Sequence, residues 1–194
     1  MMQNFAANLV EGFVQPRRSA QRIIALGPDL RTCLLMVVLA YAIQAATVTL
    51  LGMASPGLPA GGGLAMRVQE LVLQIALFFA LTFGAHTIGA RFGGTGTRDE
   101  VAAVVAWHAL VTAFLAPFNV LGIGAATPEA HLPEAFILFA PFSVGVSIWL
   151  FAQYIAEAHR FTRIAPVIGA TLLGFIVLGF VALLLSALLS GSGA

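Results

Sequence analysis

Five long apolar stretches, separated by shorter connections, dominate the pattern of hydrophobic and polar positions along the chain. They cover residues 32–52, 71–90, 101–125, 135–156 and 164–189, and none contains Asp, Glu or Arg. A helix of about 20 apolar residues crosses a bilayer core, whereas membrane strands alternate polar and apolar residues over about 10 positions. The nearly continuous apolar character of these stretches therefore predicts an all-α membrane protein with five transmembrane helices.

The arginines lie almost entirely on one side of these five stretches. Four precede the first stretch, two lie in the second connection and two in the fourth, whereas the opposite side holds Arg67 alone. Connections on the cytoplasmic side of a membrane are enriched in basic residues. We therefore expect a cytoplasmic N-terminus, a transmembrane domain over residues 32–189 and a tail, residues 190–194, on the far side.

Residues 1–31 are expected to form a cytoplasmic or interfacial amphipathic segment. Three apolar residues recur at four-residue spacing and three arginines follow them: Phe5, Leu9, Phe13, Arg17, Arg18 and Arg22. This order favours a short helix in the membrane interface, with its arginines on anionic lipid headgroups. A frayed leader is the alternative, because Gly12 and Pro16 disfavour a regular helix.

Composition supports the membrane interpretation and excludes other classes of protein. Charged residues form 9% of the chain and hydrophobic residues 60%, whereas about 25% of a soluble domain is charged. A soluble enzyme and a nucleic-acid-binding module are therefore excluded, and no nucleic-acid partner is expected. All nine basic residues are arginine. With the many alanines and glycines, this bias indicates a GC-rich bacterial genome and hence a bacterial cytoplasmic (inner) membrane.

The third apolar stretch has two structured faces. Five alanines step along it by four, three, four and three positions: Ala102, Ala106, Ala109, Ala113 and Ala116. Small residues in such a stripe let another helix approach closely. His108, Thr112 and Asn119 form a polar stripe about 100° away. Two structured faces predict that this helix is surrounded by protein at the centre of the bundle.

Local signals predict the ends and irregularities of the helices. Thr97 and Glu100 form a capping-box pattern before the third stretch. Pro133 is expected to open the fourth helix. Three further prolines fall inside apolar stretches and are expected to kink them: Pro117, Pro141 and Pro166.

Polar residues of the second, third and fourth stretches form the candidate site. His86, His108, Gln153, Glu157 and His159 lie near the cytoplasmic ends, and Thr112 and Asn119 continue the polar stripe of the third stretch. A shared cluster of imidazoles and a carboxylate would suit a divalent metal or a proton relay. The alternative, which we favour, is that each histidine bonds a carbonyl or hydroxyl and ties helices together. No motif with metal-ligand or catalytic spacing is present, so neither a catalytic residue nor a cofactor is predicted.

Three segments resemble bacterial members of the Yip family, the Ypt/Rab-interacting membrane proteins. They are residues 13–18 (FVQPRR), residues 88–97 (IGARFGGTGT), and residues 148–163, which contain IWLFAQY and AHRFTR. The resemblance implies a small helical bundle that works through protein or lipid contacts. Eukaryotic relatives bind small GTPases through a longer N-terminal region and carry an aspartate-leucine-tyrosine-glycine-proline motif. This chain has neither feature, so a GTPase partner is not expected.

Three functions are compatible with the sequence. The leading hypothesis is a non-enzymatic membrane protein that scaffolds or organises the membrane, with membrane lipids, its own copies or another membrane protein as partners. The second is transport of an ion, a proton or a small solute along the polar faces of the second and third helices. The third is an accessory subunit of a larger membrane complex.

Overall fold

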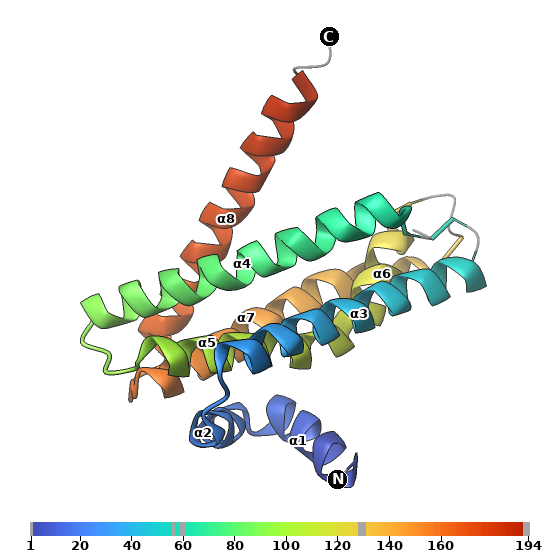
Figure 1. Cartoon of the computed structure of the whole chain (residues 1–194). Helices are drawn as coiled ribbons and strands as arrows, with labels where there is room; N and C mark the ends of the chain where they lie inside the picture. Colours follow the sequence, from blue (N-terminus) through green and yellow to red (C-terminus); the bar gives the residue numbers. More distant parts are fainter. Residues whose placement is uncertain (1, 56, 59–60, 128–130, 192–194) are drawn as a thin grey trace.

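The computed structural model describes residues 2–55, 57–58, 61–127 and 131–191, and every regular element in these ranges is helical (Figure 1). The bounds of the elements are α1 Met2–Val14, α2 Pro16–Leu26, α3 Leu30–Ala54, α4 Leu64–Arg91, α5 Arg98–Thr112, η1 Ala113–Leu115, α6 Ala116–Ala125, η3 Glu134–Leu138, α7 Phe139–Ala158 and α8 Ala165–Gly191. The predicted all-α class is confirmed. Residues 192–194 of the predicted tail lie outside the described residues.

Among the residues that the structure describes, four helical segments are long and apolar enough to cross a membrane. They are Leu30–Ala54, Leu64–Arg91, Arg98–Ala125 and Glu134–Ala158, and they correspond to the first four predicted spans. Helix α8 overlaps the fifth predicted span, 164–189. Side chains at residues 178–179 and 181–191 are not described.

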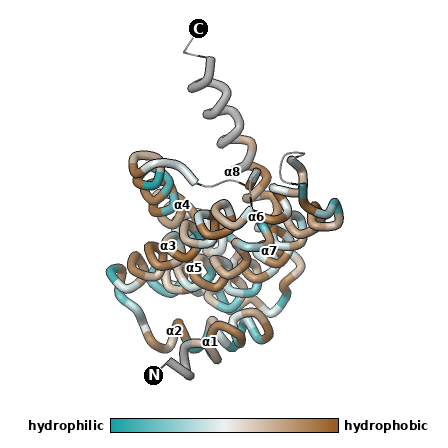
Figure 2. The backbone as a smooth tube through the Cα atoms, turned by 90° about the vertical axis from the view of Figure 1, so that its right-hand side faces the viewer, coloured by the Kyte–Doolittle hydropathy of each residue, from teal (hydrophilic) through white to brown (hydrophobic). Residues whose placement is uncertain are grey.

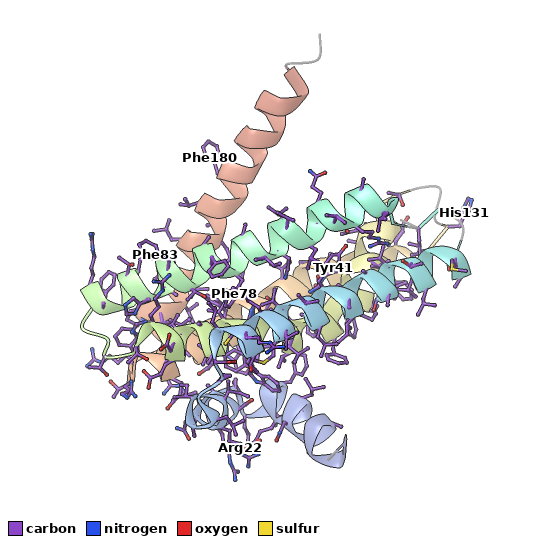
Figure 3. The ribbon with its side chains drawn as sticks, in the orientation of Figure 1. Arg22, Tyr41, Phe78, Phe83, His131 and Phe180 are labelled. Atoms are coloured by element: carbon purple, nitrogen blue, oxygen red, sulfur yellow. The ribbon has the colours of Figure 1, made fainter. Side chains whose placement is uncertain are left out.

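Helix α4 is longer than its apolar stretch, because it begins at Leu64 and not at Leu71. The added first turns carry polar side chains that have partners. Arg67 pairs with Glu70 at 3.5 Å and donates to the Thr49 hydroxyl at 3.0 Å. The Tyr41 hydroxyl, between α3 and α4, donates to Glu70 at 3.0 Å (Figure 3). Hydropathy shows where the apolar surface of a helix ends, whereas the helix itself extends as far as its backbone hydrogen bonds continue.

The prediction of an interior kink is wrong for Pro166, which lies in the first turn of α8, where an amide would have no carbonyl partner within the helix. Pro141 follows a change within its span, from the 3-10 turn η3 to α7. Pro117 does interrupt its span, which changes from α5 through the 3-10 turn η1 to α6. Pro133 precedes a 3-10 turn, η3, that leads into α7.

Helix α5 is the central helix, as its two structured faces predict. The most apolar stretch of its span, Arg98–Ala125, is 72% buried, against 11% for α3, 11% for α4 and 22% for the span Glu134–Ala158. It contacts α2, α3, α4 and α7, and the predicted capping box at Thr97 and Glu100 is formed in full. Four alanines of the stripe are buried and Ala109 is partly buried. The stripe therefore serves packing within one chain.

The outer helices present an apolar surface (Figure 2). Leu35 on α3 and Leu73 and Phe83 on α4 are 59%, 68% and 60% exposed. Helix α8 leaves the bundle after its contact with α7 and leans away from it (Figure 1). A surface of this kind is stable in hydrocarbon and not in water. The fold is therefore that of an integral membrane protein.

Candidate functional site

The predicted polar cluster is divided into separate contacts that lie on different helix pairs. His108 and Thr112 are on α5, Asn119 is on α6, and His86 is near the end of α4. Gln153, Glu157 and His159 are in or next to the last turns of α7. The structure brings His86 and His159 together, but each of the other residues contacts a different neighbour.

His108 is paired with Ser147 across α5 and α7. Its Nε2 lies 3.0 Å from the Ser147 carbonyl oxygen and 3.2 Å from the Ser147 hydroxyl. A carbonyl only accepts hydrogen bonds, so Nε2 must carry the proton that it donates there. The same nitrogen then has no lone pair with which to deprotonate the serine. This pair is therefore a helix-helix contact and not a nucleophile with its base.

Asn119 and Thr112 also serve local packing. The Ser143 hydroxyl of α7 donates to the Asn119 side-chain oxygen of α6. The Thr112 hydroxyl donates to the His108 carbonyl, one turn earlier in the same helix, at 2.7 Å. Two residues of the predicted polar stripe, His108 and Asn119, thus contact α7, and the third, Thr112, bonds the backbone of its own helix.

His86 and His159 stack at the turn that joins α4 to α5, with ring centroids 6.3 Å apart. The Nε2 of His159 donates to the Ala85 carbonyl at 3.1 Å, whereas the buried Nδ1 atoms of both histidines have no partner. The His159 ring packs against Gly89 and Gly94. Burial lowers the pKa of His159 below its ordinary value of 6.5, which favours the neutral ring.

Gln153 and Glu157 bind the N-terminal helices. Arg17 donates through Nε to the Gln153 side chain at 3.0 Å and through Nη2 to the Phe161 carbonyl at 3.3 Å. Gln21 donates to the Glu157 carboxylate at 2.9 Å. These contacts place α2 against the last turns of α7. The arginine distribution predicts that this end of α7 faces the cytoplasm.

Two buried aromatic residues complete this docking, and the sequence interpretation missed both. The Trp107 indole N–H donates to the Ser19 hydroxyl at 2.8 Å, and the Tyr154 hydroxyl donates to the Gly12 carbonyl at 3.0 Å. Tyrosine and tryptophan in a core usually require one polar partner. That requirement was the available signal, but it does not identify the partner.

Residues 1–31 therefore contain two docked helices, and the prediction of one short helix is wrong in that respect. Pro16 starts α2 and separates it from α1. Leu9 and Phe13 pack on the core of the bundle. The side chain of Phe5 lies outside the described residues.

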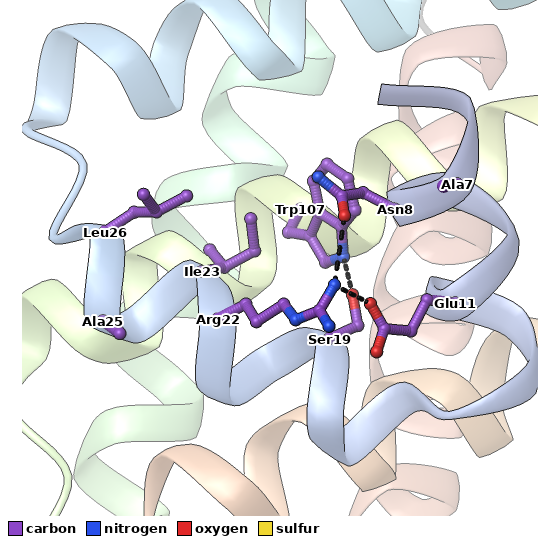
Figure 4. A pocket seen from close by; sticks show the side chains of 9 residues that line it. All are labelled: Ala7, Asn8, Glu11, Ser19, Arg22, Ile23, Ala25, Leu26 and Trp107. Carbon is purple, nitrogen blue, oxygen red and sulfur yellow. Dashed lines mark hydrogen bonds and ion pairs between the residues drawn. The ribbon is translucent and has the colours of Figure 1, made fainter. Parts of the chain in front are cut away.

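The side chains of Arg18 and Arg22 are 61% and 50% exposed. Both pair with Glu11 of α1, and Arg22 also donates to Asn8 at 3.3 Å. Between α1 and α2 lies a cavity of about 530 Å³ with Trp107 on its wall (Figure 4). Its polar side chains, Asn8, Glu11, Ser19 and Arg22, all bond one another or Trp107, as the dashed lines in Figure 4 show.

Among the described residues, no group of three or more histidine, cysteine, aspartate or glutamate side chains could hold a metal ion. His86 and His159 supply two imidazoles without a third ligand. The arrangement of polar side chains thus supports helix-helix contact in the described part of the chain, and it offers no assembled set of catalytic groups.

Comparisons with known proteins identify one family. The family model described as the Yip1 domain matches residues 11–189, which is almost the whole chain. None of the curated proteins and none of the solved structures matches it. The match begins in the last turn of α1 and ends in α8, so it includes α2 and the helices of the bundle. The chain belongs to the Yip1 domain family of integral membrane proteins.

Proposed function

We propose that this protein is a non-enzymatic component of the bacterial cytoplasmic membrane that scaffolds or organises it through helix-helix and lipid contacts. One observation carries this proposal. The buried polar side chains of Trp107, His108 and Tyr154 bond other side chains or the backbone, whereas the outward faces of α3, α4, α7 and α8 are apolar. A protein arranged in this way acts through its outer surface.

We propose five crossings, with α8 as the fifth and the N-terminus in the cytoplasm. Helix α8 spans Ala165–Gly191 and contains no charged residue. At about 1.5 Å per residue its 27 residues reach roughly 40 Å, more than the hydrocarbon core of a bilayer. The arginine distribution supports the orientation.

Helix α8 is the element we assign to self-association or to a second membrane protein. Its exposed apolar side chains include Leu173 and Ile176, at 63% and 66%. The alanine stripe, which could have supplied such an interface, is already packed inside the chain.

Crosslinking in native membranes tests this assignment. In a Cys33→Ala background, Leu173→Cys is expected to form a covalent dimer at native abundance. The matched control, Leu50→Cys, places an equally exposed residue on α3 and is expected to remain monomeric. No dimer from α8, or equal dimer from both positions, would contradict a specific contact.

We also propose that N-terminal arginines contact lipid headgroups, and we limit this contact to Arg18 and Arg22. Arg18 and Arg22 keep about half of their side-chain surface exposed, but Arg17 is bound to α7. The combined change Arg18→Glu and Arg22→Glu is expected to weaken binding of the full chain's N-terminal region to anionic vesicle surfaces. Protection of that region from protease by the vesicles measures the binding. Protection that is the same with and without the two substitutions would contradict the headgroup contact.

Transport along the second and third spans has less support. Its candidate path would need His86 and His108 in one hydrated route. His108 is 7% exposed and bonded to Ser147, and His86 lies instead beside His159. Proteoliposome flux that depends on both histidines would favour transport over scaffolding.

A further inference from the structure

A cavity of about 610 Å³ lies between α3, α4 and the start of α5, apart from the contacts described above. Its inner wall is apolar and buried, with Phe78 at 3% and Ala103 at 1% exposure. Its mouth is charged, because Asp29 precedes α3 and Arg98 and Asp99 begin α5. The cavity therefore changes from charged to apolar along its length.

This change in polarity follows the direction in which a lipid lies in a bilayer. The charged mouth is formed at helix ends, where the interface begins. Thr82 lies nine residues before the end of α4, roughly 13 Å along its axis, and Ala103 lies roughly 6 Å beyond Asp99 along α5. Leu30 and Phe79, at 53% and 40% exposure, lie on the rim. An occupant with a charged head and an apolar tail fits this arrangement.

Thr82 lines the deep part of the cavity, and its side chain lacks a hydrogen-bond partner. Its hydroxyl is buried and makes no hydrogen bond. Threonine in a helix commonly donates to a carbonyl one turn earlier, as Thr47 and Thr49 of α3 do at 2.9 and 2.8 Å. A buried hydroxyl without a partner is destabilising. An occupant with an oxygen at this depth would supply the missing acceptor.

The mouth can bind both signs of charge. Glu100 is already engaged by Arg160 at 2.7 Å and by the Thr97 amide at 2.7 Å. Asp99 and the second carboxylate oxygen of Asp29, whose first oxygen caps α3 by accepting from the Thr32 amide at 2.8 Å, remain as acceptors, and Arg98 remains as a cation. The first amides of a helix such as α5 lack intrahelical acceptors and favour an anion. A headgroup that carries a phosphate next to a primary ammonium would satisfy both sets.

We propose that this cavity binds one membrane phospholipid with a phosphoethanolamine headgroup. The ammonium lies at Asp29 and Asp99, and the phosphate lies at Arg98 and the first turn of α5. An ester oxygen accepts from the Thr82 hydroxyl, and an acyl chain follows Phe78. This inference rests on the proposed function only in requiring that the chain lies in a bilayer.

Native mass spectrometry of the full-length, delipidated protein tests the proposal with three lipids. Phosphatidylethanolamine is expected to bind about tenfold more tightly than phosphatidylcholine, whose quaternary ammonium has no N–H to donate to a carboxylate. It is also expected to bind about tenfold more tightly than phosphatidylglycerol, which has no cation for Asp29 and Asp99. Equal binding of the three lipids would overturn the proposal.

Two variants locate the site. Asp29→Asn with Asp99→Asn removes both charges but keeps the α3 cap, because asparagine caps as well as aspartate. This double variant is expected to bind the ethanolamine and choline lipids equally. Thr82→Val is expected to weaken phosphatidylethanolamine binding about fivefold, because a hydrogen bond is lost. Thr47→Val is the matched control, since its hydroxyl bonds its own helix outside the cavity.

The variants also separate this site from self-association. If the cavity is empty, Thr82→Val removes an unsatisfied hydroxyl and leaves lipid affinity unchanged, a result that would overturn the proposal. An unchanged lipid preference in the Asp29→Asn, Asp99→Asn protein would do the same. Crosslinking through α8 at Leu173→Cys is expected to be equal in all these variants, so its failure would refute the assigned α8 contact and leave the lipid site standing.

Discussion

The indole of Trp107 and the phenol of Tyr154 show how single residues join the parts of this molecule. Each has an apolar body in the core and one polar atom, and each polar atom reaches the N-terminal helices. A buried polar atom stabilises a fold only while its partner is present, because its loss leaves the other group unsatisfied. These two residues therefore couple the N-terminal helices to the bundle.

Trp107→Phe is expected to lower the free energy of unfolding by about 1–3 kcal/mol, because Ser19 is left buried without its donor. Combining it with Ser19→Ala is expected to recover about 1 kcal/mol of coupling in a double-mutant cycle. Denaturant unfolding in detergent micelles provides the measurement. Trp149→Phe, at a residue 40% exposed on the outer face of α7, is the control, and an equal loss there would contradict a specific role for Trp107.

Gly89 and Gly84 of α4 are a matched pair for the contact with His159. A Cβ at Gly89 would overlap the His159 ring, whereas one at Gly84 would meet nothing within 4 Å. Gly84→Ala is expected to be neutral or to stabilise by up to about 1 kcal/mol, since alanine favours a helix. Gly89→Ala is expected to destabilise the fold in the same unfolding assay. Similar effects of the two changes would show that the imidazole does not fill this space.

The depressed pKa of His159 predicts a loss of stability in acid. Above the ordinary value of 6.5 the ring is neutral in the folded and the unfolded chain, so stability is complete. As the pH falls below that value, the unfolded chain binds a proton that the folded chain refuses. The free energy of unfolding is therefore expected to fall between about pH 7 and about pH 5. His159→Gln is expected to flatten this slope, whereas His131→Gln, at an exposed residue, is expected to retain it.

The faces of residues were predictable from the sequence, but their partners were not. Helical periodicity places His108 and Thr112 on one side of their helix. It does not show that His108 meets Ser147 while Thr112 bonds its own backbone. The candidate polar residues do not form one shared site for the same reason. Side chains at a comparable depth in the membrane are not in contact when they lie on different helix pairs.

At the scale of elements, the break at Pro117 and the extension of α4 have separate causes. Pro117 lacks an amide, so its span changes to a 3-10 turn before α6. The polar start of α4 remains helical because Arg67 and Glu70 have partners on α3 and on each other. Apolar stretches therefore predicted the first four spans and their order well and the ends of the helices less well.

Arg17 is expected to hold α2 on the bundle more strongly than Arg18 does. Arg17→Ala removes two hydrogen bonds to Gln153 and Phe161. Arg18 is 61% exposed and pairs only with neighbouring residues of the N-terminal segment. Hydrogen exchange of α2 amides in the full-length protein is expected to increase at least about tenfold in Arg17→Ala. Equal exchange in Arg18→Ala would contradict this difference.

The whole molecule combines an enclosed central helix with an apolar exterior. Helix α5 is surrounded by α2, α3, α4 and α7, and large apolar side chains face outward from α3 and α4. The membrane class and the central position of the third span were predictable, because both follow from the pattern of apolar and small residues. The docking of α1 and α2 was not, because it depends on contacts between residues more than one hundred positions apart, such as Gly12 and Tyr154.

The central claim is that the chain crosses the membrane an odd number of times, because the side of the membrane assigned to each connection depends on it. Reporter tags fused to the two termini, probed with an impermeant protease in sealed inverted membrane vesicles, measure it directly. Five crossings predict that the N-terminal tag is cleaved and that the C-terminal tag is protected until detergent is added. Cleavage of both tags, or protection of both, would contradict five crossings and remove α8 from the membrane.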